Sequence, residues 1–176
     1  ELCEAASDTT NLRYQNEAID RVVAAGATFF ASSGDDGIYD CGLAGGSQTQ
    51  VTVAYPASYP SAVAVGGTNL QAAGTSWAET AWSCTDQTTC APSGTGGSGG
   101  GESAYFAKPS YQTDLGAPYD SAAGRLVPDI AVDGDSDTGF LVYAPDDPNA
   151  NSSGYTQIGG TSLSSPIAAA TFTAML

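Results

Sequence analysis

The sequence has 176 residues, of which 19 are acidic and 4 are basic, and it contains no histidine. The resulting formal charge of −15 makes phosphate backbones and anionic lipid headgroups unfavourable partners, so we expect neither nucleic-acid nor membrane binding. Without histidine the chain cannot hold a Ser-His-Asp triad or an imidazole-based zinc site. Proton transfer must therefore use carboxylates, tyrosines or water.

The composition is that of a polar but weakly ionic protein. Apolar residues make up 41% of the chain and charged residues only 13%, while glycine, serine, threonine and alanine are abundant. The length suits one domain or a large piece of one, with enough apolar residues for a core. We expect a secreted, acid-tolerant protein, and no apolar run is long enough to span a bilayer.

Four cysteines allow three pairings. Cys84 and Cys90 bracket a short loop and form the natural local pair, which leaves Cys3 to pair with Cys41. The alternative is a metal cluster held by all four thiolates, but none of the gaps has the C-x2-C spacing of zinc sites. Disulfides are the favoured interpretation, and they indicate an oxidising, extracellular compartment.

The first part of the chain predicts a helix followed by a buried strand. Apolar residues recur at helical spacing over residues 13–25, and Gly26 follows where a C-cap is expected. Residues 27–31 form a short continuous apolar run, which is typical of a buried parallel strand in an α/β sheet. The polar turn at residues 32–37 then lies at the carboxyl end of that strand, where such sheets build their sites.

Further elements follow in order along the chain. A strand is expected at residues 62–65, ending at the Gly-Gly-Thr of residues 66–68. The Gly/Ser-rich residues 93–101 are interpreted as an internal loop rather than a linker, because aromatic residues follow closely. Two strands are expected at residues 139–143 and 155–158, and then a helix with Pro166 in its first turn. That placement puts Ser162 at or just before the start of the last helix.

A serine at the start of a helix can serve as a nucleophile. The helix dipole and free backbone N–H groups stabilise negative charge there, as a tetrahedral oxyanion requires. Spacing alone does not distinguish this role of Ser162 from that of an ordinary N-cap for Ser162 or Ser164, which is the more frequent one.

Several ordered motifs resemble one peptidase family. Residues 160–166 read G-T-S-L-S-S-P and resemble the nucleophile motif shared by subtilisins and by sedolisins, the serine-carboxyl peptidases. The missing histidine favours sedolisins, which use a glutamate supported by an aspartate as base and another aspartate in the oxyanion hole. Further matches to this family follow one another in the same order, at residues 31–37, 55–68, 99–103, 109–112 and 127–130.

The resemblance implies a subtilisin-like parallel sheet with flanking helices and a peptidase that works through an acyl-enzyme. Ser162 would be the nucleophile, Asp35 the oxyanion-stabilising acid, and Asp36 part of the substrate-binding pocket, where it would favour polar or basic side chains. A carboxyl group donates a hydrogen bond only while it is protonated, so an aspartic acid, with a usual pKa of about 3.9, implies acid activity. Peptide substrates and a propeptide in the precursor are also implied.

Two parts of the family's machinery do not match within residues 1–176. The Glu/Asp base lies upstream of the matched region in the family, and the calcium site lies downstream. We therefore expect the C-terminal portion of a catalytic domain, with no cofactor or metal ligand in this chain, calcium in the full-length domain, and little activity from the chain alone because its serine lacks a base.

Glu4 and Asp8 are the internal alternative for the missing base. They are four residues apart and would share one face of a helix. The segment that contains them resembles a region after the true base pair in the family. Solvated acids at the start of a helix is therefore the favoured interpretation.

A calcium loop is the other alternative that the acidic residues suggest. Asp133, Asp135 and Asp137 resemble a D-x-D-x-D loop, but the glycine falls one place late and Ala144 replaces the final glutamate. A structural turn is favoured. Two rival functions stay open: a non-catalytic secreted module that keeps the fold, and a calcium-binding adhesion module.

Overall fold

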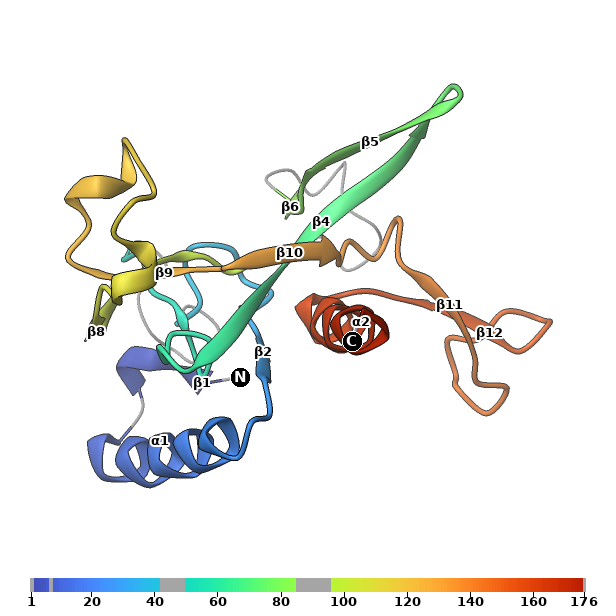
Figure 1. Ribbon diagram of the computed structural model, residues 1–176. Coiled ribbons are helices and arrows are strands. Elements are labelled where there is room, and N and C mark those ends of the chain that lie inside the picture. The colour runs from blue at the N-terminus through green and yellow to red at the C-terminus, as the bar shows by residue number, and fades with distance from the viewer. Residues whose placement is uncertain (1, 7, 42–49, 85–95, 176) are drawn as a thin grey trace.

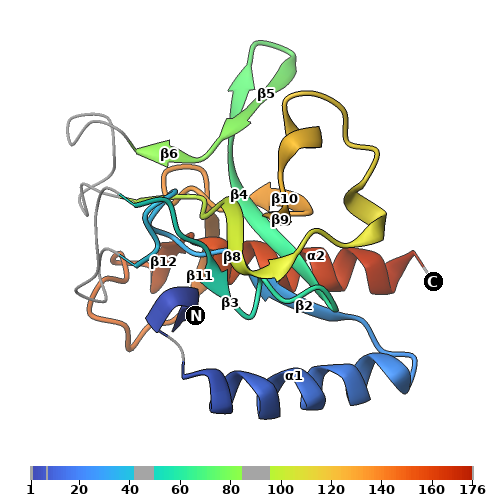
Figure 2. The same cartoon turned by 90° about the vertical axis from the view of Figure 1, so that its left-hand side faces the viewer.

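The computed structural model describes residues 2–6, 8–41, 50–84 and 96–175. At its centre is a parallel sheet in which β4 (Ala62–Ala73) lies between β2 (Phe29–Ser32) and β10 (Ile130–Asp133). The helices α1 (Thr9–Ala24) and α2 (Thr161–Ala174) lie on opposite faces of this sheet (Figures 1 and 2). The expected parallel sheet with flanking helices is confirmed.

The remaining elements surround this centre. β5 (Ser76–Ala81) pairs antiparallel with the second half of β4, and three short 3-10 helices lie in the connections. The other antiparallel pairs are β1 (Leu2–Cys3) with β3 (Ala54–Tyr55), β6 (Ser83–Cys84) with β7 (Gly96–Gly97), β8 (Gly101–Ala107) with β9 (Gly124–Val127), and β11 (Phe140–Tyr143) with β12 (Tyr155–Ile158). In the part of the chain that the structure describes, neither helix is long and apolar enough to cross a bilayer.

The local sequence explains α1 at both ends. Asp8 is its N-cap, because its carboxylate accepts a hydrogen bond from the Thr10 N–H at 3.0 Å. Leu12 and Ile19 are buried, and Gly26 follows the helix with a φ of 88°. The predicted helix is confirmed, and it begins four residues earlier than the apolar periodicity suggested.

A compact set of small side chains forms the core on the α1 side of the sheet. Phe29 and Tyr59 pack against it. Its buried members come from β2, β4, β9 and the segment around β3, and they are Ala31, Val53, Ala57, Ala62, Ala64 and Val127. On the other face, α2 packs on β2, β4 and β10, and the rings of Phe30 and Phe172 lie 5.6 Å apart.

The prediction that the second strand stops at residues 66–68 is wrong, because β4 continues to Ala73. Gly66 and Gly67 pair with Ala131 and Val132 of β10. A Cβ on Gly66 would lie 2.7 Å from the Ser98 hydroxyl oxygen, and one on Gly67 would lie 2.8 Å from the Trp82 ring. The two glycines therefore permit close packing over the sheet, and they do not form a turn.

The start of α2 also differs from the prediction. The helix begins at Thr161, so Pro166 is its sixth residue rather than part of the first turn, while Ser162 does lie near the N-terminus as expected. Proline lacks an N–H and therefore cannot donate the usual helical hydrogen bond to the carbonyl of Ser162. The N-cap is Gly160, which offers no side-chain cap, so the sequence around the helix carries no local signal for its start.

Other predictions have mixed outcomes. The hairpin expected near residues 139–158 is confirmed by β11 and β12, and the Cys3–Cys41 disulfide is present. The Cys84–Cys90 pair lies outside the described residues. Of the Gly/Ser-rich segment, residues 96–101 are described, and their hydrogen bonds to the turn after β2 and to Trp82 make them part of the folded domain rather than a linker.

Candidate active site

The turn after β2 carries Asp35 to the N-terminus of α2. One carboxylate oxygen of Asp35, Oδ1, accepts hydrogen bonds from the Thr161 N–H at 2.7 Å and from the Thr161 hydroxyl at 2.8 Å. The other oxygen, Oδ2, lies against Gly160, where an added Cβ would be 2.7 Å away. A residue 126 positions earlier thus caps α2, in the field of the helix dipole.

Thr161 ties the same turn to the helix a second time. Its hydroxyl oxygen accepts a hydrogen bond from the Gly34 N–H at 3.2 Å. Gly34 has a φ of 105°, and a Cβ there would lie 2.3 Å from a carboxylate oxygen of Asp40. The turn therefore requires glycine at this position, both for its left-handed backbone and for space.

Ser162 follows Thr161 as the second residue of α2. Its side chain is exposed, and neither its hydroxyl nor its main-chain N–H makes a hydrogen bond with any described residue. Free N–H groups are intrinsic to the first turn of a helix. Ser162 therefore presents a hydroxyl and an N–H donor at the helix end whose preceding residue, Thr161, donates to the Asp35 carboxylate.

A glycine-rich segment holds the Asp35 turn from the other side. The N–H of Gly97 donates to the Asp35 carbonyl at 2.8 Å, and the N–H of Gly99 donates to the Gly34 carbonyl at 2.7 Å. A Cβ on Gly99 would lie only 1.9 Å from the Ser33 carbonyl oxygen. The abundance of glycine in this segment thus reflects contact between two backbones.

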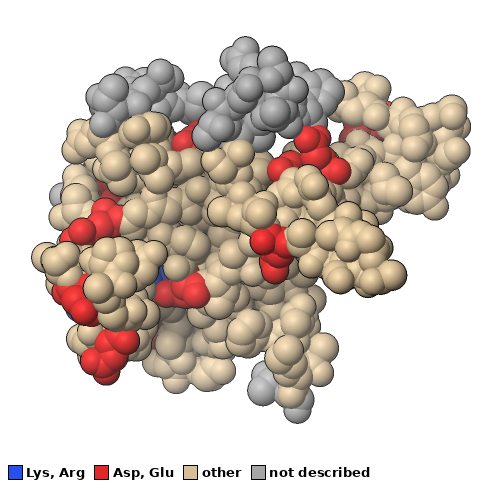
Figure 3. Space-filling model, turned by 90° about the horizontal axis from the view of Figure 1, so that it is seen from above, with Lys and Arg blue, Asp and Glu red and all other residues tan. Residues whose placement is uncertain are grey.

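Asp36 faces a groove beside this contact. The groove has a volume of about 830 Å³, and its lining includes Asp36, Glu79, Trp82 and Pro128. Burial, followed by repulsion from the neighbouring carboxylate of Asp35, raises the pKa of Asp36. The surface drawn in Figure 3 shows separate groups of acidic side chains and only a trace of basic ones, in keeping with the four basic residues of the chain.

The structure separates the two acids that were considered as an internal base. Asp8 caps α1, whereas Glu4 lies in a separate 3-10 helix, Glu4–Ala6, so the two do not share a helix face. The interpretation as solvated acids is right for exposed Asp8 and wrong for Glu4, of which only 3% is exposed. The helix α1, which Asp8 caps, lies on the face of the sheet opposite to α2, the helix that carries Ser162 (Figure 2).

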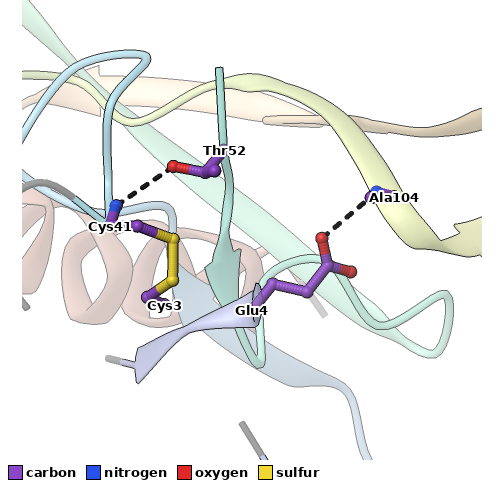
Figure 4. Close-up of a disulfide and its surroundings, with 5 residues drawn as sticks. All are labelled: Cys3, Glu4, Cys41, Thr52 and Ala104. Atoms are coloured by element: carbon purple, nitrogen blue, oxygen red, sulfur yellow. Dashed lines mark hydrogen bonds between the residues drawn. A yellow bond between two sulfur atoms is a disulfide. The ribbon is translucent and has the colours of Figure 1, made fainter. Parts of the chain in front are cut away.

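Glu4 is buried because β8 covers it. Its carboxylate accepts hydrogen bonds from the Ser103 hydroxyl and from the Ala104 N–H, as Figure 4 shows for Ala104 beside the Cys3–Cys41 disulfide. Burial raises the pKa of Glu4, and the hydrogen bonds from Ser103 and Ala104 oppose that effect without cancelling it. The Ser58 hydroxyl itself is fully buried and completes no hydrogen bond with a described residue.

The acidic residues after β10 form a structural turn. The Asp133 carboxylate accepts a hydrogen bond from the Thr138 hydroxyl at 2.7 Å, and the Asp135 carboxylate accepts one from the Asn69 amide at 2.7 Å. Across the described residues, no three acidic, cysteine or histidine side chains gather in a way that could hold a metal ion. This turn therefore does not fit a calcium ion.

Two site residues were not singled out from the sequence. Thr161 stands directly before Ser162 in the nucleophile motif, but its hydrogen bonds reach a turn more than a hundred positions earlier. Gly99 belongs to a segment whose composition alone is typical of a linker. In both cases the partner is distant in the sequence, so no local pattern could identify it.

A hydroxyl and a carboxyl therefore meet at the N-terminus of a helix that packs on a parallel sheet, in a subtilisin-like α/β arrangement. The profile of the Subtilase family matches residues 4–176. The chain belongs to the subtilase family, and the predicted resemblance to its sedolisin-like members is confirmed.

Several characterised proteins support this assignment. Sedolisin from Pseudomonas sp. (strain 101) is 38% identical over 94% of this chain, and kumamolisin from Bacillus sp. (strain MN-32) is 36% identical over 88%. The solved complex of Pseudomonas sedolisin with two molecules of pseudo-iodotyrostatin superimposes with a TM-score of 0.75 at 36% identity, over 94% of this chain and 42% of that one. The chain spans 27% of the sedolisin sequence and 26% of kumamolisin.

Proposed function

We propose that this chain carries the nucleophile and the oxyanion-stabilising acid of a serine-carboxyl peptidase. The observation that carries the proposal is the position of the Asp35 carboxylate, which accepts a hydrogen bond from the Thr161 N–H at 2.7 Å. The exposed Ser162 is the next residue after Thr161 in the chain. In acyl transfer, a protonated acid at a helix N-terminus can donate a hydrogen bond to the oxyanion that forms when the nucleophile attacks.

The arrangement suits attack on a peptide carbonyl. The Ser162 oxygen would bond to the carbonyl carbon, while the carbonyl oxygen gains negative charge and accepts hydrogen bonds from the Ser162 N–H and the protonated Asp35 carboxyl. Collapse of this intermediate releases the amine and leaves an acyl-enzyme, which water then hydrolyses. Because an ionised carboxylate cannot donate, the reaction belongs to acidic conditions.

The proton of the Ser162 hydroxyl needs an acceptor. Within the described part of the chain, no carboxylate hydrogen-bonds to Ser162. The family resemblance assigns the base to a glutamate supported by an aspartate, and we expect the 176-residue chain alone to be a weak catalyst without it.

The same proposal implies a class of substrate and an extracellular location. The substrate is a peptide or protein, and Asp36 lies in a groove that would receive one of its side chains. The composition and the Cys3–Cys41 disulfide support secretion. By resemblance, the whole protein would be made with a propeptide and would bind calcium in a region that this chain does not cover.

An activated ester tests the nucleophile without requiring peptide cleavage. When p-nitrophenyl acetate acylates a serine, the acetyl group moves to the hydroxyl oxygen and p-nitrophenol leaves. We expect mass spectrometry to place the acetyl group on Ser162, and Asp35→Ala to slow the reaction by about 100-fold, the usual effect of losing one oxyanion donor. Ser164→Ala is the matched control, since the buried Ser164 hydroxyl donates instead to the carbonyls of Val132 and Asp133.

One result would count against the proposal, and another would overturn only the expectation that the chain alone is a weak catalyst. Equal labelling of the wild type and Ser162→Ala would show that Ser162 has no special reactivity and would favour the non-catalytic module. Rapid peptide cleavage at acid pH by the purified chain, lost in Ser162→Ala, would instead show that a base is already present.

A further inference from the structure

We propose that Thr161 is a positioning residue that fixes the Asp35 carboxyl so that its proton is carried on Oδ2, the oxygen beside Gly160. This inference rests on the proposed function, in which protonated Asp35 donates to the oxyanion. It adds the element that decides which of the two carboxyl oxygens is the donor.

Oδ1 of Asp35 already accepts hydrogen bonds from two donors. The N–H and the hydroxyl of Thr161 both point at this oxygen, at 2.7 and 2.8 Å. A carboxyl oxygen that accepts two hydrogen bonds is a poor place for a proton, because the proton would face one of the donors. A proton on Asp35 therefore resides on Oδ2.

The Thr161 hydroxyl has one hydrogen to donate. Its oxygen accepts the Gly34 N–H at 3.2 Å, and a main-chain N–H can only donate. The same hydroxyl donates to Oδ1 of Asp35 at 2.8 Å. Thr161 is fully buried, so water does not compete for it.

Oδ2 of Asp35 has a different neighbour. This oxygen lies against Gly160, whose φ of 90° and lack of a side chain let the carboxyl approach the chain just before the nucleophile. No described residue donates a hydrogen bond to Oδ2. A proton held there points toward the end of α2, where the Ser162 N–H is also free.

A peptide aldehyde and the matching peptide alcohol can separate positioning from binding. The Ser162 oxygen adds to the aldehyde carbon, and the hydroxyl proton ends on the new hemiacetal oxygen, so no leaving group or base is consumed. The alcohol cannot form this adduct. The ratio of their dissociation constants, measured on the 176-residue chain by calorimetry at acid pH, therefore reports stabilisation of the tetrahedral oxygen alone.

The variants are chosen to isolate the Thr161 hydroxyl. Thr161→Val keeps the shape and removes the hydroxyl, and we expect the preference for the aldehyde to fall by about 10-fold to 100-fold while alcohol binding stays the same. Thr161→Ser restores the hydroxyl and should recover most of the preference. If Thr161→Val and Thr161→Ser reduce the preference equally, the hydroxyl does not position Asp35 and the inference is wrong.

A double-mutant cycle covers the case in which the effect of Thr161→Val is structural. If Thr161 acts through Asp35, adding Thr161→Val to Asp35→Ala should cause no further loss. Additive losses would contradict the inference. Should Thr161→Val not fold, the Thr161 amide proton resonance gives a second measurement: Asp35→Ala should shift it upfield, and an unchanged resonance would contradict the hydrogen bond on which the inference depends.

The same experiment distinguishes the inference from the proposed function. If Ser162→Ala keeps the preference for the aldehyde, Ser162 is not the nucleophile and the proposed function fails. If Ser162→Ala abolishes the preference but Thr161→Val leaves it intact, the proposed function stands and only the role of Thr161 is wrong.

Discussion

Two carboxyl groups in separate parts of the molecule, one against β8 and one at the start of α2, have different surroundings. Glu4 is enclosed by β8 and accepts from the Ser103 hydroxyl and the Ala104 N–H, and burial raises its pKa. Asp35 is only partly buried, at the end of a helix, and only its Oδ1 is occupied by donors among the described residues.

The two acids differ in how many of their carboxylate oxygens accept hydrogen bonds from the fold. The two Glu4 oxygens accept from Ser103 and Ala104, whereas among the described residues only one oxygen of Asp35 accepts a hydrogen bond, at the helix end that carries the exposed Ser162. An unused hydrogen-bonding atom next to a nucleophile is a better guide to function than burial alone. The following experiments test whether the two regions are as separate as the geometry indicates.

The largest expected effect is on the Glu4 side. The Cys3–Cys41 disulfide closes a loop with a sequence separation of 38 and holds the segment that includes Glu4. Replacing both cysteines by serine should lower the free energy of unfolding by about 4 kcal/mol, as measured by urea denaturation. Under conditions where the variant stays folded, acylation of Ser162 should change by less than about twofold. A large loss of acylation would show that the two regions are coupled.

A slightly smaller effect is expected for Gly99→Ala, on the Asp35 side. The new Cβ would lie 1.9 Å from the Ser33 carbonyl oxygen, so two backbones must separate, and we expect a loss of about 3 kcal/mol in unfolding free energy. Gly116→Ala is the control. Its φ of 77° strains the variant, but no atom lies within 4 Å of the added Cβ, so about 1 kcal/mol is expected. Equal losses in urea denaturation would contradict the contact.

Glu4→Gln should change how stability depends on pH. Because the pKa of Glu4 is raised by folding, the folded state holds this proton more tightly than the unfolded state. Glu4 thus contributes stability that is present below the ordinary value of 4.5 and is lost as pH rises through the higher pKa of the folded state. The variant cannot ionise there, so wild type should lose stability relative to it on going from acid to neutral pH.

Other titratable groups lie on the elements around Glu4, namely Tyr55, Tyr59, Glu102 and Tyr105. The effects on the pKa of Glu4 come from burial and hydrogen bonds, without a charged neighbour. The difference between wild type and Glu4→Gln in urea denaturation therefore isolates Glu4. A constant difference across pH would contradict the raised pKa.

The smallest expected effect on stability is that of Ser162→Ala. The side chain is exposed and makes no hydrogen bond with a described residue, so the free energy of unfolding should change by no more than about 0.5 kcal/mol. Circular dichroism during urea denaturation provides the measurement. A loss above about 1 kcal/mol would show that the Ser162 side chain makes a stabilising contact rather than presenting a free hydroxyl.

Local patterns predicted the elements that depend on neighbours in the sequence. The helix before Gly26, the strand after it and the hairpin of β11 and β12 follow from periodicity and turn residues. The motifs also identified Asp35 and Ser162 as residues of one site, and the structure brings them together at one helix end.

The features that sequence could not predict depend on distant partners. The start of α2 is set by Asp35, which is 126 positions away, and the burial of Glu4 by Ser103, which is 99 positions away. Likewise, β4 continues through two glycines because β10 pairs with them. Capping, burial and pairing by remote residues leave no trace in the local pattern.

The most direct test of the central claim is the pH dependence of Ser162 acylation in wild type and in Asp35→Asn. An asparagine at this position can accept from Thr161 through its oxygen and donate to the oxyanion through its amide at any pH. We predict that the acylation rate of wild type relative to Asp35→Asn falls as pH rises, because an ionised carboxylate cannot donate a hydrogen bond to the oxyanion. A rate ratio that does not change with pH would contradict the assignment of Asp35 as the protonated donor beside Ser162.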